Sequence, residues 1–438
     1  MGKRSVSGWT EHFEKSHATP EEAARVVNSG DRVVTGHACG EPRLVIDALV
    51  DRADELTDVE IVHMVAMGES RYCLPEYKDS FRFNGFFIGA TTRNAVWGGR
   101  ADYTPCYFHQ IPRLFRDGTM PVDVAMIVVS SPDADGTVSL GISVDYTIQA
   151  ARAARVVIAE VNPQMPRTGP ESRIPVIDID YFIPSDRPLY TITPPVNGEV
   201  ERRIGEHIAG LIRDGDCLQM GIGAIPDAVL GFLEGKKDLG IHTEMISDGV
   251  MHLVEKGVIT GSRKTLHPGK IILNFAMGTE RLYRWLDDNP IIDAHPVDYT
   301  NDPAIVAKND NMVAINSSIS VDLLGQASSE SIGPRQFSGV GGQVDFIRGA
   351  AASKGGRSII ALPATAKDGE VSRIVAGLEP GQAVTPSRND VDFVVTEFGV
   401  ACLWGMTMRE RAKALIDIAA PAFHDSLARE CHSLYGWL

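Results

Sequence analysis

Closely spaced cysteines are missing from this sequence. Its six cysteines, at positions 39, 73, 106, 217, 402 and 431, are scattered, and no two form a C-x-x-C pair. Zinc cages and disulfide frameworks both depend on such spacings. The run His242-Thr243-Glu244 begins like the H-x-E signature of zinc nucleobase deaminases, but the P-C-x-x-C that completes this signature does not occur. We therefore expect reduced thiols and no metal site.

Long apolar runs and an excess of positive charge are missing as well. No stretch approaches about 18 uninterrupted apolar residues, and the N-terminus turns polar at once. These absences argue against a membrane partner and favour a cytoplasmic location. Lys and Arg total 42 against 57 Asp and Glu, a net charge of -15. Because duplex binding relies on clustered Lys and Arg, the balance also argues against nucleic acid as a partner.

Several common site motifs are incomplete. A dinucleotide site needs G-x-G-x-x-G, whereas the Gly221-x-Gly223 pair is followed by Ala-Ile-Pro. No G-x-S-x-G elbow precedes a helix, so a serine hydrolase lacks the signal for its nucleophile. A retaining glycosidase needs two spaced carboxylates, but Glu244 and Asp248 lie on one local segment.

What is present indicates a large α/β protein. The 438 residues, 44% hydrophobic and 23% charged, correspond to roughly two or three domains. Short buried strands alternate with glycine turns and amphipathic helices, the pattern of parallel α/β units. We expect strands within residues 32–35, 59–63, 122–129, 156–160, 271–278, 304–314, 358–362 and 391–396, and helices within 8–30, 43–50, 143–154, 249–255 and 407–416.

One pattern of residues and predicted elements occurs twice in the sequence. Gly30-Asp31, a strand, glycines, Pro42 and an apolar helix return as Gly215-Asp216, a strand, glycines, Pro226 and an apolar helix. We interpret this as a weak internal duplication, although any two strand-turn-helix units share Gly and Pro. The fold class is therefore predicted as two related open α/β domains with mostly parallel sheets. Eight prolines between 162 and 195 mark the crossing, which gives domains 1–190 and 191–438.

Glu244 is the candidate catalytic residue. It lies at a predicted strand end between two glycine loops, Gly221–Ile225 and Ser338–Gly342. A carboxylate can act as a nucleophile toward an acyl centre, and glycine loops can bring backbone N–H donors close to a ligand. Many strand ends carry a solvated Glu, however, and the turn before Pro226 is equally compatible with no ligand. On residues alone both interpretations stay open.

Four runs in order carry a resemblance that spans nearly the whole chain. They are Gln219–Pro226, His242–Gly249, Ser338–Phe346 and Thr396–Ala401. In these runs the sequence resembles the 4-hydroxybutyrate and butyrate:acetyl-CoA CoA-transferases, within the acetyl-CoA hydrolase/transferase family. The resemblance implies the CoA-transferase fold, acyl-CoA and short-chain carboxylates as substrates, CoA as both substrate and covalent intermediate, no metal, and a homodimer.

The resemblance also implies roles for individual residues. Glu244 would attack the thioester, and the CoA thiolate would then attack the glutamyl carbonyl to form a glutamyl-CoA thioester. Asn301 would be a side-chain oxyanion donor, with a backbone N–H of Gly341 or Gly342 as its partner. CoA contacts would come from Gly221, Ile222, Gly223, Ala224, Ile225, Gly341, Gly342 and Lys367. The alternatives are an acyl-CoA hydrolase, in which water attacks the anhydride, and a non-catalytic module that binds CoA or a sugar phosphate.

Overall fold

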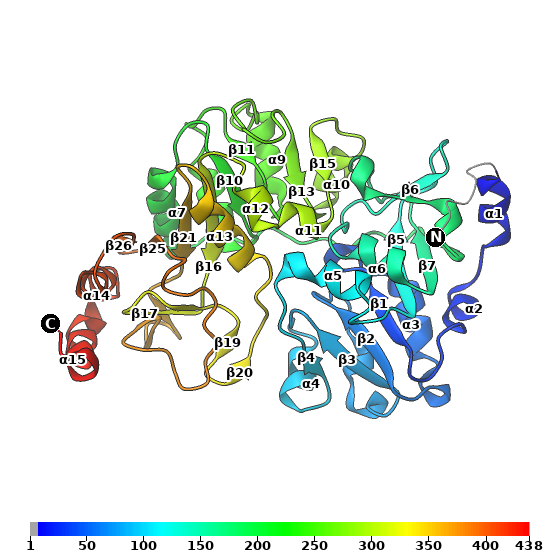
Figure 1. Ribbon diagram of the computed structural model, residues 1–438, viewed down its shortest axis with the longest axis horizontal. Coiled ribbons are helices and arrows are strands. Elements are labelled where there is room, and N and C mark those ends of the chain that lie inside the picture. Colours follow the sequence, from blue (N-terminus) through cyan, green and yellow to red (C-terminus); the bar gives the residue numbers. More distant parts are fainter. Residues whose placement is uncertain (1–7, 438) are drawn as a thin grey trace. The chain divides into compact units, whose positions relative to one another are not determined.

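The computed structural model describes residues 8–437 (Figure 1). Contacts within the chain divide these residues into two compact units. The first holds the described residues up to Ile192 together with Ile272–Tyr299, and the second holds Thr193–Ile271 and Thr300 onward. The single division at residue 190 stays a prediction, and Ile272–Tyr299 groups with the first unit. Within residues 8–437 no helix combines the length and the apolar character needed to span a membrane.

The first unit is built on a seven-stranded sheet in which all neighbouring strands are parallel. Strand β5 is buried along its whole length, as expected for a parallel strand covered on both faces. In spatial order the strands are β4 (Asp102–Tyr103), β3 (Phe81–Gly85), β2 (Val59–His63), β1 (Arg32–Thr35), β5 (Val124–Val129), β7 (Val156–Val161) and β9 (Tyr181–Pro184).

Short helices cover this sheet. Helix α2 (Pro20–Ala24) starts at a capping box, in which the Thr19 side chain accepts from the Glu22 N–H and the Glu22 carboxylate accepts from the Thr19 N–H. Its buried face packs with helix α3 (Arg43–Val50) in the core above β1 and β2. The remaining helices of the unit are α1 (Trp9–Lys15), α4 (Arg93–Trp97), α5 (Ile111–Arg116), α6 (Thr147–Ala153) and α10 (Glu280–Leu286).

The proline-rich segment holds a strand that the sequence did not reveal. Residues 162–195 were expected only to cross between domains, but β9 within them pairs with β7 and forms one edge of the sheet. Proline cannot donate to a ladder, so it is tolerated at an edge strand. Pro184 is the last residue of β9. The density of proline correctly excluded α-helix but concealed an edge strand, and the only helical turns within 162–195 are short 3-10 segments.

The second unit contains a six-stranded sheet with the predicted mostly parallel character. Five neighbouring strands are parallel, and the last strand is antiparallel. In spatial order they are β11 (Gly240–Ile241), β10 (Cys217–Met220), β16 (Met312–Ser317), β21 (Arg357–Ala361), β25 (Phe393–Thr396) and β26 (Gly399–Cys402). Its main helices are α7 (Glu199–Leu211), α8 (Ala224–Gly231), α9 (Asp248–Glu255), α13 (Gln343–Ala352), α14 (Met408–Asp417) and α15 (His424–Tyr435). The predicted fold class is confirmed.

The two units share the turn that enters their first long parallel strand. Gly30 and Gly215 both have a φ of 82°, which favours glycine. In each turn the aspartate after the glycine accepts from the N–H three residues before it, Asn28 to Asp31 at 2.9 Å and Arg213 to Asp216 at 2.7 Å. The prolines differ, because Pro42 precedes α3 whereas Pro226 is the third residue of α8.

Residues 304–314 are the clearest error of the strand prediction. Helix α12 (Pro303–Val306) occupies their first part, and β16 begins only at Met312. The Asp302 side chain accepts from the Ala304 N–H at 2.8 Å, and Pro303 follows at the first helical position. These two start signals outweigh the apolar residues that suggested a strand. Similarly, residues 271–278 form two short strands, β13 (Ile271–Leu273) and β14 (Phe275–Ala276), in place of one.

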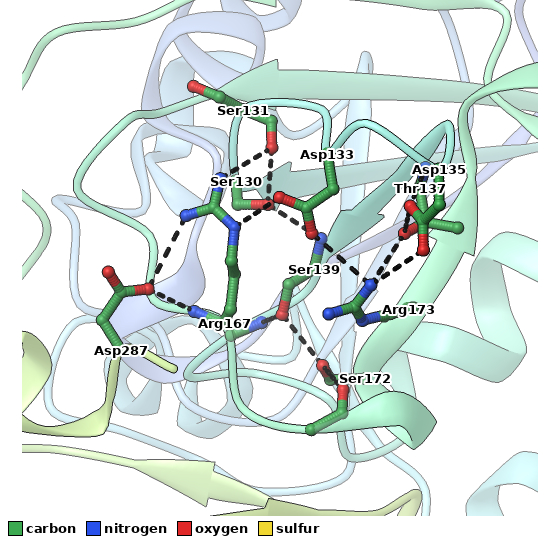
Figure 2. Close-up of polar contacts among 12 residues, drawn as sticks. Ser130, Ser131, Asp133, Asp135, Thr137, Ser139, Arg167, Ser172, Arg173 and Asp287 are labelled. Atoms are coloured by element: carbon green, nitrogen blue, oxygen red, sulfur yellow. Dashed lines mark hydrogen bonds and ion pairs between the residues drawn. The ribbon is translucent and has the colours of Figure 1, made fainter. Parts of the chain in front are cut away.

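A polar network fixes the returning segment to the first unit (Figure 2). The Arg167 guanidinium donates to Asp133 at 2.6 Å, and its backbone N–H donates to the Asp287 carboxylate at 2.9 Å. Arg173 donates to Asp135 at 3.0 Å beside it. Since Asp287 belongs to Ile272–Tyr299, these bonds help to hold that segment with residues far away in the sequence.

Glu160 is a buried carboxylate whose titration should affect stability. It lies on β7 with 3% exposure, and its Oε1 accepts from the Val45 N–H at 3.0 Å at the start of α3. Burial raises the pKa of Glu160 from 4.5 to about 7, although backbone N–H groups and arginines partly oppose the shift. The folded state therefore binds a proton that the unfolded chain releases, so this group destabilises the fold as pH rises from 4.5 through 7.

We expect Glu160→Gln to be more stable than the wild type at pH 8, by up to about 3 kcal/mol, because the neutral amide avoids the cost of the buried charge. At pH 5 most of this gain should vanish. Urea unfolding at the two pH values measures it, with the exposed Glu171→Gln as the control. A stability difference that does not change with pH would contradict the explanation.

Candidate active site

Glu244 lies at the carboxyl edge of the sheet in the second unit, between β11 and β12 (Met245–Ile246). The carboxyl ends of parallel strands are where α/β sheets place their ligands. His242, Thr243, Met245 and Ile246 around it are buried, each 5% exposed or less, whereas Glu244 itself is half-buried. The Glu244 carboxylate is therefore flanked by buried residues. This environment differs from that of a fully solvated Glu at a strand end, which was the alternative interpretation of the sequence.

Thr243 ties the Glu244 segment to the end of β10. Its Oγ1 donates toward the carbonyls of Met220 at 3.1 Å and Met245 at 3.0 Å, and it accepts from the Met220 N–H at 3.4 Å. Met220 directly precedes the glycine turn, so one buried hydroxyl sets the spacing between Glu244 and that turn. Met220, Thr243 and Met245 also line a small cavity of about 10 Å³, most of whose other lining side chains are apolar. It has room for no more than a single water.

Asn301 contacts the carboxylate directly. It follows Thr300, has no exposed surface, and its Nδ2 donates to Glu244 Oε2 at 2.8 Å across 57 residues of sequence. A buried amide that donates to a carboxylate is a charge-assisted hydrogen bond in a water-poor setting. The structure thus brings together the two side chains that the resemblance singled out.

Gly342 packs against the same carboxylate. A Cβ built on Gly342 would overlap both Glu244 Oε2 and Asn301 Nδ2 and would lie 3.0 Å from Glu244 Cδ. Its φ of -91° suits any residue, so glycine is required here for space and not for backbone conformation. Gly341 has a φ of 53° and supplies the bend before α13. The donor role of the Gly341 or Gly342 N–H stays a prediction.

The glycine turn Gly221–Gly223 joins β10 to α8. Gly223 has a φ of 116° and precedes the helix, which begins at Ala224, two residues before the predicted start at Pro226. Pro226 has no N–H, so the N–H groups in the first turn of this helix before Pro226 are those of Ala224 and Ile225. A Cβ on Gly221 or Gly223 would meet no atom within 4 Å, and Ile222 is 39% exposed. The turn presents backbone donors beside open space.

Lys367 lies on a separate turn of the second unit. It lies exposed at a φ of 50° in the turn between β22 (Thr365–Ala366) and β23 (Val371–Ser372). No hydrogen bond or ion pair joins it to Glu244, Asn301 or the glycines in the part of the chain that the structure describes.

In residues 8–437 no three His, Cys, Asp or Glu side chains gather into a cluster able to hold a metal.

Sequence reasoning missed the residues that hold the site together. Thr243 and His242 lie inside the motif that drew attention to Glu244, but neither was given a role. The available signal was chemical, because a hydroxyl and an imidazole within a buried segment must find partners. Those partners, Met220 for Thr243 and Thr300 for His242, are distant in sequence.

Family models match most of the chain. The N-terminal domain model of the acetyl-CoA hydrolase/transferase family covers residues 2–194, and the C-terminal domain model covers residues 278–431. Glu244 and the glycine turn fall between the two matches. The candidate role of Glu244 therefore rests on its contacts with Asn301 and Gly342.

The full-length relatives are CoA-transferases. The sequence is 56% identical over 422 residues to the 4-hydroxybutyrate coenzyme A transferase of Clostridium kluyveri, which covers 96% of this chain and 98% of the relative. It is 36% identical to the butyryl-CoA:acetate CoA-transferase of Anaerostipes caccae, which covers 98% of each chain.

Solved structures agree with these relatives. The 4-hydroxybutyrate CoA-transferase of Porphyromonas gingivalis superimposes with a TM-score of 0.84 at 42% identity, over 98% of this chain and 100% of the other. RipA from Yersinia pestis superimposes with a TM-score of 0.92 at 37% identity, over 98% of this chain and 99% of the other. With matches of this extent in sequence and structure, the chain belongs to the acetyl-CoA hydrolase/transferase family and is an enzyme of the CoA-transferase type.

Proposed function

We propose that this enzyme moves CoA between a short-chain acyl-CoA and a free short-chain carboxylate through covalent intermediates on Glu244. The observation that carries the proposal is the contact of the Glu244 carboxylate with the Asn301 amide at 2.8 Å, closed on one side by Gly342. Acetyl-CoA with butyrate or 4-hydroxybutyrate is the leading pair, from the names of the relatives.

The first half-reaction forms and then replaces an anhydride. A Glu244 oxygen attacks the thioester carbonyl, the carbon–sulfur bond breaks, and CoA leaves as a thiolate. The thiolate then attacks the glutamyl carbonyl of the mixed anhydride, the carbon–oxygen bond to this carbonyl breaks, and the acyl group leaves as a carboxylate. A glutamyl-CoA thioester remains, and the acceptor carboxylate runs the same steps in reverse. Thioester and carboxylate are exchanged, so the steps balance without an external oxidant or energy source.

Asn301 fits the second of these steps. Its amide donates to Glu244 Oε2 in the resting enzyme. When the thiolate attacks the glutamyl carbonyl, negative charge develops on a glutamyl oxygen, and a donor already directed at that oxygen needs little rearrangement. The predicted second donor is the N–H of Gly341 or Gly342, next to the carboxylate. Two fixed donors in a water-poor site would favour transfer to sulfur over hydrolysis.

CoA binding is proposed along the turn Gly221–Ile225. Its backbone N–H groups suit carbonyl or phosphate oxygens, and Thr243 holds the turn at a fixed spacing from Glu244. Binding the long CoA arm here can offset the cost of positioning the acyl carbon, since holding reactants together contributes on the order of 7 to 11 kcal/mol. A phosphate contact by Lys367, a homodimer and a cytoplasmic location stay predictions.

The test is a two-substrate kinetic experiment with acetyl-CoA and butyrate. We expect butyryl-CoA to form in step with the loss of acetyl-CoA, with parallel lines in double-reciprocal plots, because the first product leaves before the acceptor binds. Free thiol should stay far below butyryl-CoA. Thiol release without butyryl-CoA would favour the hydrolase alternative, and intersecting lines would rule out the covalent scheme.

A further inference from the structure

His242 is a fully buried imidazole two residues before Glu244. Its Nε2 lies 2.8 Å from the carbonyl oxygen of Thr300, and its Nδ1 lies 3.2 Å from Nδ2 of Asn309. The Thr300 carbonyl can only accept and the Asn309 amide nitrogen can only donate. This geometry places a hydrogen on Nε2, which is donated to Thr300, and leaves Nδ1 to accept from the Asn309 amide.

The carbonyl that His242 holds belongs to the peptide bond of Asn301. The peptide group between Thr300 and Asn301 is planar, so a hydrogen bond that holds the Thr300 carbonyl also holds the Asn301 backbone. The Asn301 side chain in turn donates to Glu244 Oε2. His242 shares a three-residue segment with Glu244. The imidazole thus spans the two backbone segments whose side chains meet at the carboxylate.

The same ring also packs against helix α13, whose N-cap residue is Gly342. The His242 ring lies edge-on to Phe346, with centroids 6.3 Å apart and planes at 65°. The Phe346 N–H donates to the Gly342 carbonyl at 3.0 Å in the first turn of α13. The backbone of Asn309 is held in turn, because its main-chain carbonyl accepts from Ser353 Oγ at 2.6 Å. Glu244 and the two residues against its carboxylate, Asn301 and Gly342, are thus all linked to one buried imidazole.

We infer that His242 is a positioning residue for CoA transfer, acting through its Nε2–H bond to the Thr300 carbonyl to place the Asn301 amide on Glu244. The inference rests on the proposed function. Loss of a single oxyanion donor costs about 10²-fold to 10³-fold in kcat, and misplacement by about 1 Å costs about 10²-fold. Loss of the Nε2–H bond should therefore act on kcat and leave acyl-CoA binding largely unchanged.

Two amide substitutions of His242 distinguish the role of Nε2 from the role of Nδ1. The amide of His242→Gln can reach the place of Nε2 and donate to Thr300, whereas the amide of His242→Asn reaches only the place of Nδ1. We expect His242→Asn to lower kcat about 10²-fold with KM for acetyl-CoA changed less than about 3-fold, and His242→Gln to keep kcat within about 5-fold of the wild type. Equal losses in both variants, or a loss that appears in KM, would overturn the inference.

A double-mutant cycle tests whether His242 acts through Asn301. Combined with Asn301→Ala, His242→Asn should lower kcat less than about 2-fold further, because the group it positions is gone. Additive losses would overturn the inference. If His242→Asn fails to fold, His242→Phe replaces it, because this variant keeps a ring against Phe346 but has no N–H for the Thr300 carbonyl, and an unchanged kcat would equally overturn the inference. If Asn301→Ala and Glu244→Gln leave transfer intact, the proposed function itself fails, whereas a normal His242→Asn alongside inactive Glu244→Gln defeats only this inference.

Discussion

Replacing Glu244 by Gln is expected to lower kcat for CoA transfer by at least about 10⁴-fold, because an amide cannot form the anhydride on which both half-reactions depend. The variant keeps the length of the side chain and one oxygen that can accept from Asn301, so the fold should persist. Transfer from acetyl-CoA to butyrate, followed by chromatography of the CoA esters, measures the loss. Thermal unfolding confirms that the protein is intact.

Two further variants make this prediction specific. Glu244→Asp shortens the side chain by one methylene and withdraws the carboxylate from Asn301, for which we expect about a 10²-fold loss. Glu206→Gln, at an exposed position of α7, should behave as the wild type. Wild-type activity in Glu244→Gln or Glu244→Ala would contradict a covalent carboxylate and would leave the non-catalytic binding module as the better explanation.

Gly342→Ala is expected to lower kcat by about 10²-fold to 10³-fold, although it adds a single methyl group. The new Cβ would overlap Glu244 Oε2 and Asn301 Nδ2, so the carboxylate must leave its donor. The loss should be of the size seen when an oxyanion donor is removed. Because the Gly342 φ of -91° suits alanine, the backbone should not be strained and stability should change little. Steady-state kinetics and thermal unfolding test the two parts separately.

The matched control is Gly210→Ala on the exposed face of α7, where an added Cβ meets no atom within 4 Å. This variant should retain full activity, and its stability should rise slightly because alanine favours helix. If Gly342→Ala were as active as Gly210→Ala, the packing of this glycine against the carboxylate would not matter for the reaction. If it lost activity only through unfolding, the assignment of Gly342 to the site would fail.

Much of the fold could be predicted from local signals. Helix α3 and strands β1 and β2 occur at the predicted residues, because glycine turns and continuous apolar runs determine them without distant partners. Strand β9 and helix α12 could not be predicted in this way. The edge position that makes β9 compatible with proline is a tertiary property, and the Asp302-Pro303 start of α12 was overlooked beside the apolar pattern.

The site likewise contains residues that could be predicted from local sequence and residues whose roles depend on distant partners. Glu244 and its glycine loops could be proposed from the motif, since one carboxylate between such loops has a clear chemical meaning. The resemblance named Asn301, but only the fold places its amide 2.8 Å from Oε2, across 57 residues. The roles of Thr243 and His242 required their partners Met220 and Thr300, which no spacing rule connects to them. Lys367 lies in an exposed turn, and its proposed phosphate contact awaits a test.

The central claim is that the acyl transfer passes through Glu244 itself. The most direct measurement is to incubate the enzyme with acetyl-CoA without an acceptor, reduce it with borohydride, and sequence the peptides by mass spectrometry. We expect the peptide that contains residues 240–249 to carry a reduced, alcohol-bearing side chain at position 244, and the Glu244→Gln protein to carry none. A modification on any other residue, or an unmodified Glu244 in an enzyme that transfers CoA, would contradict the claim.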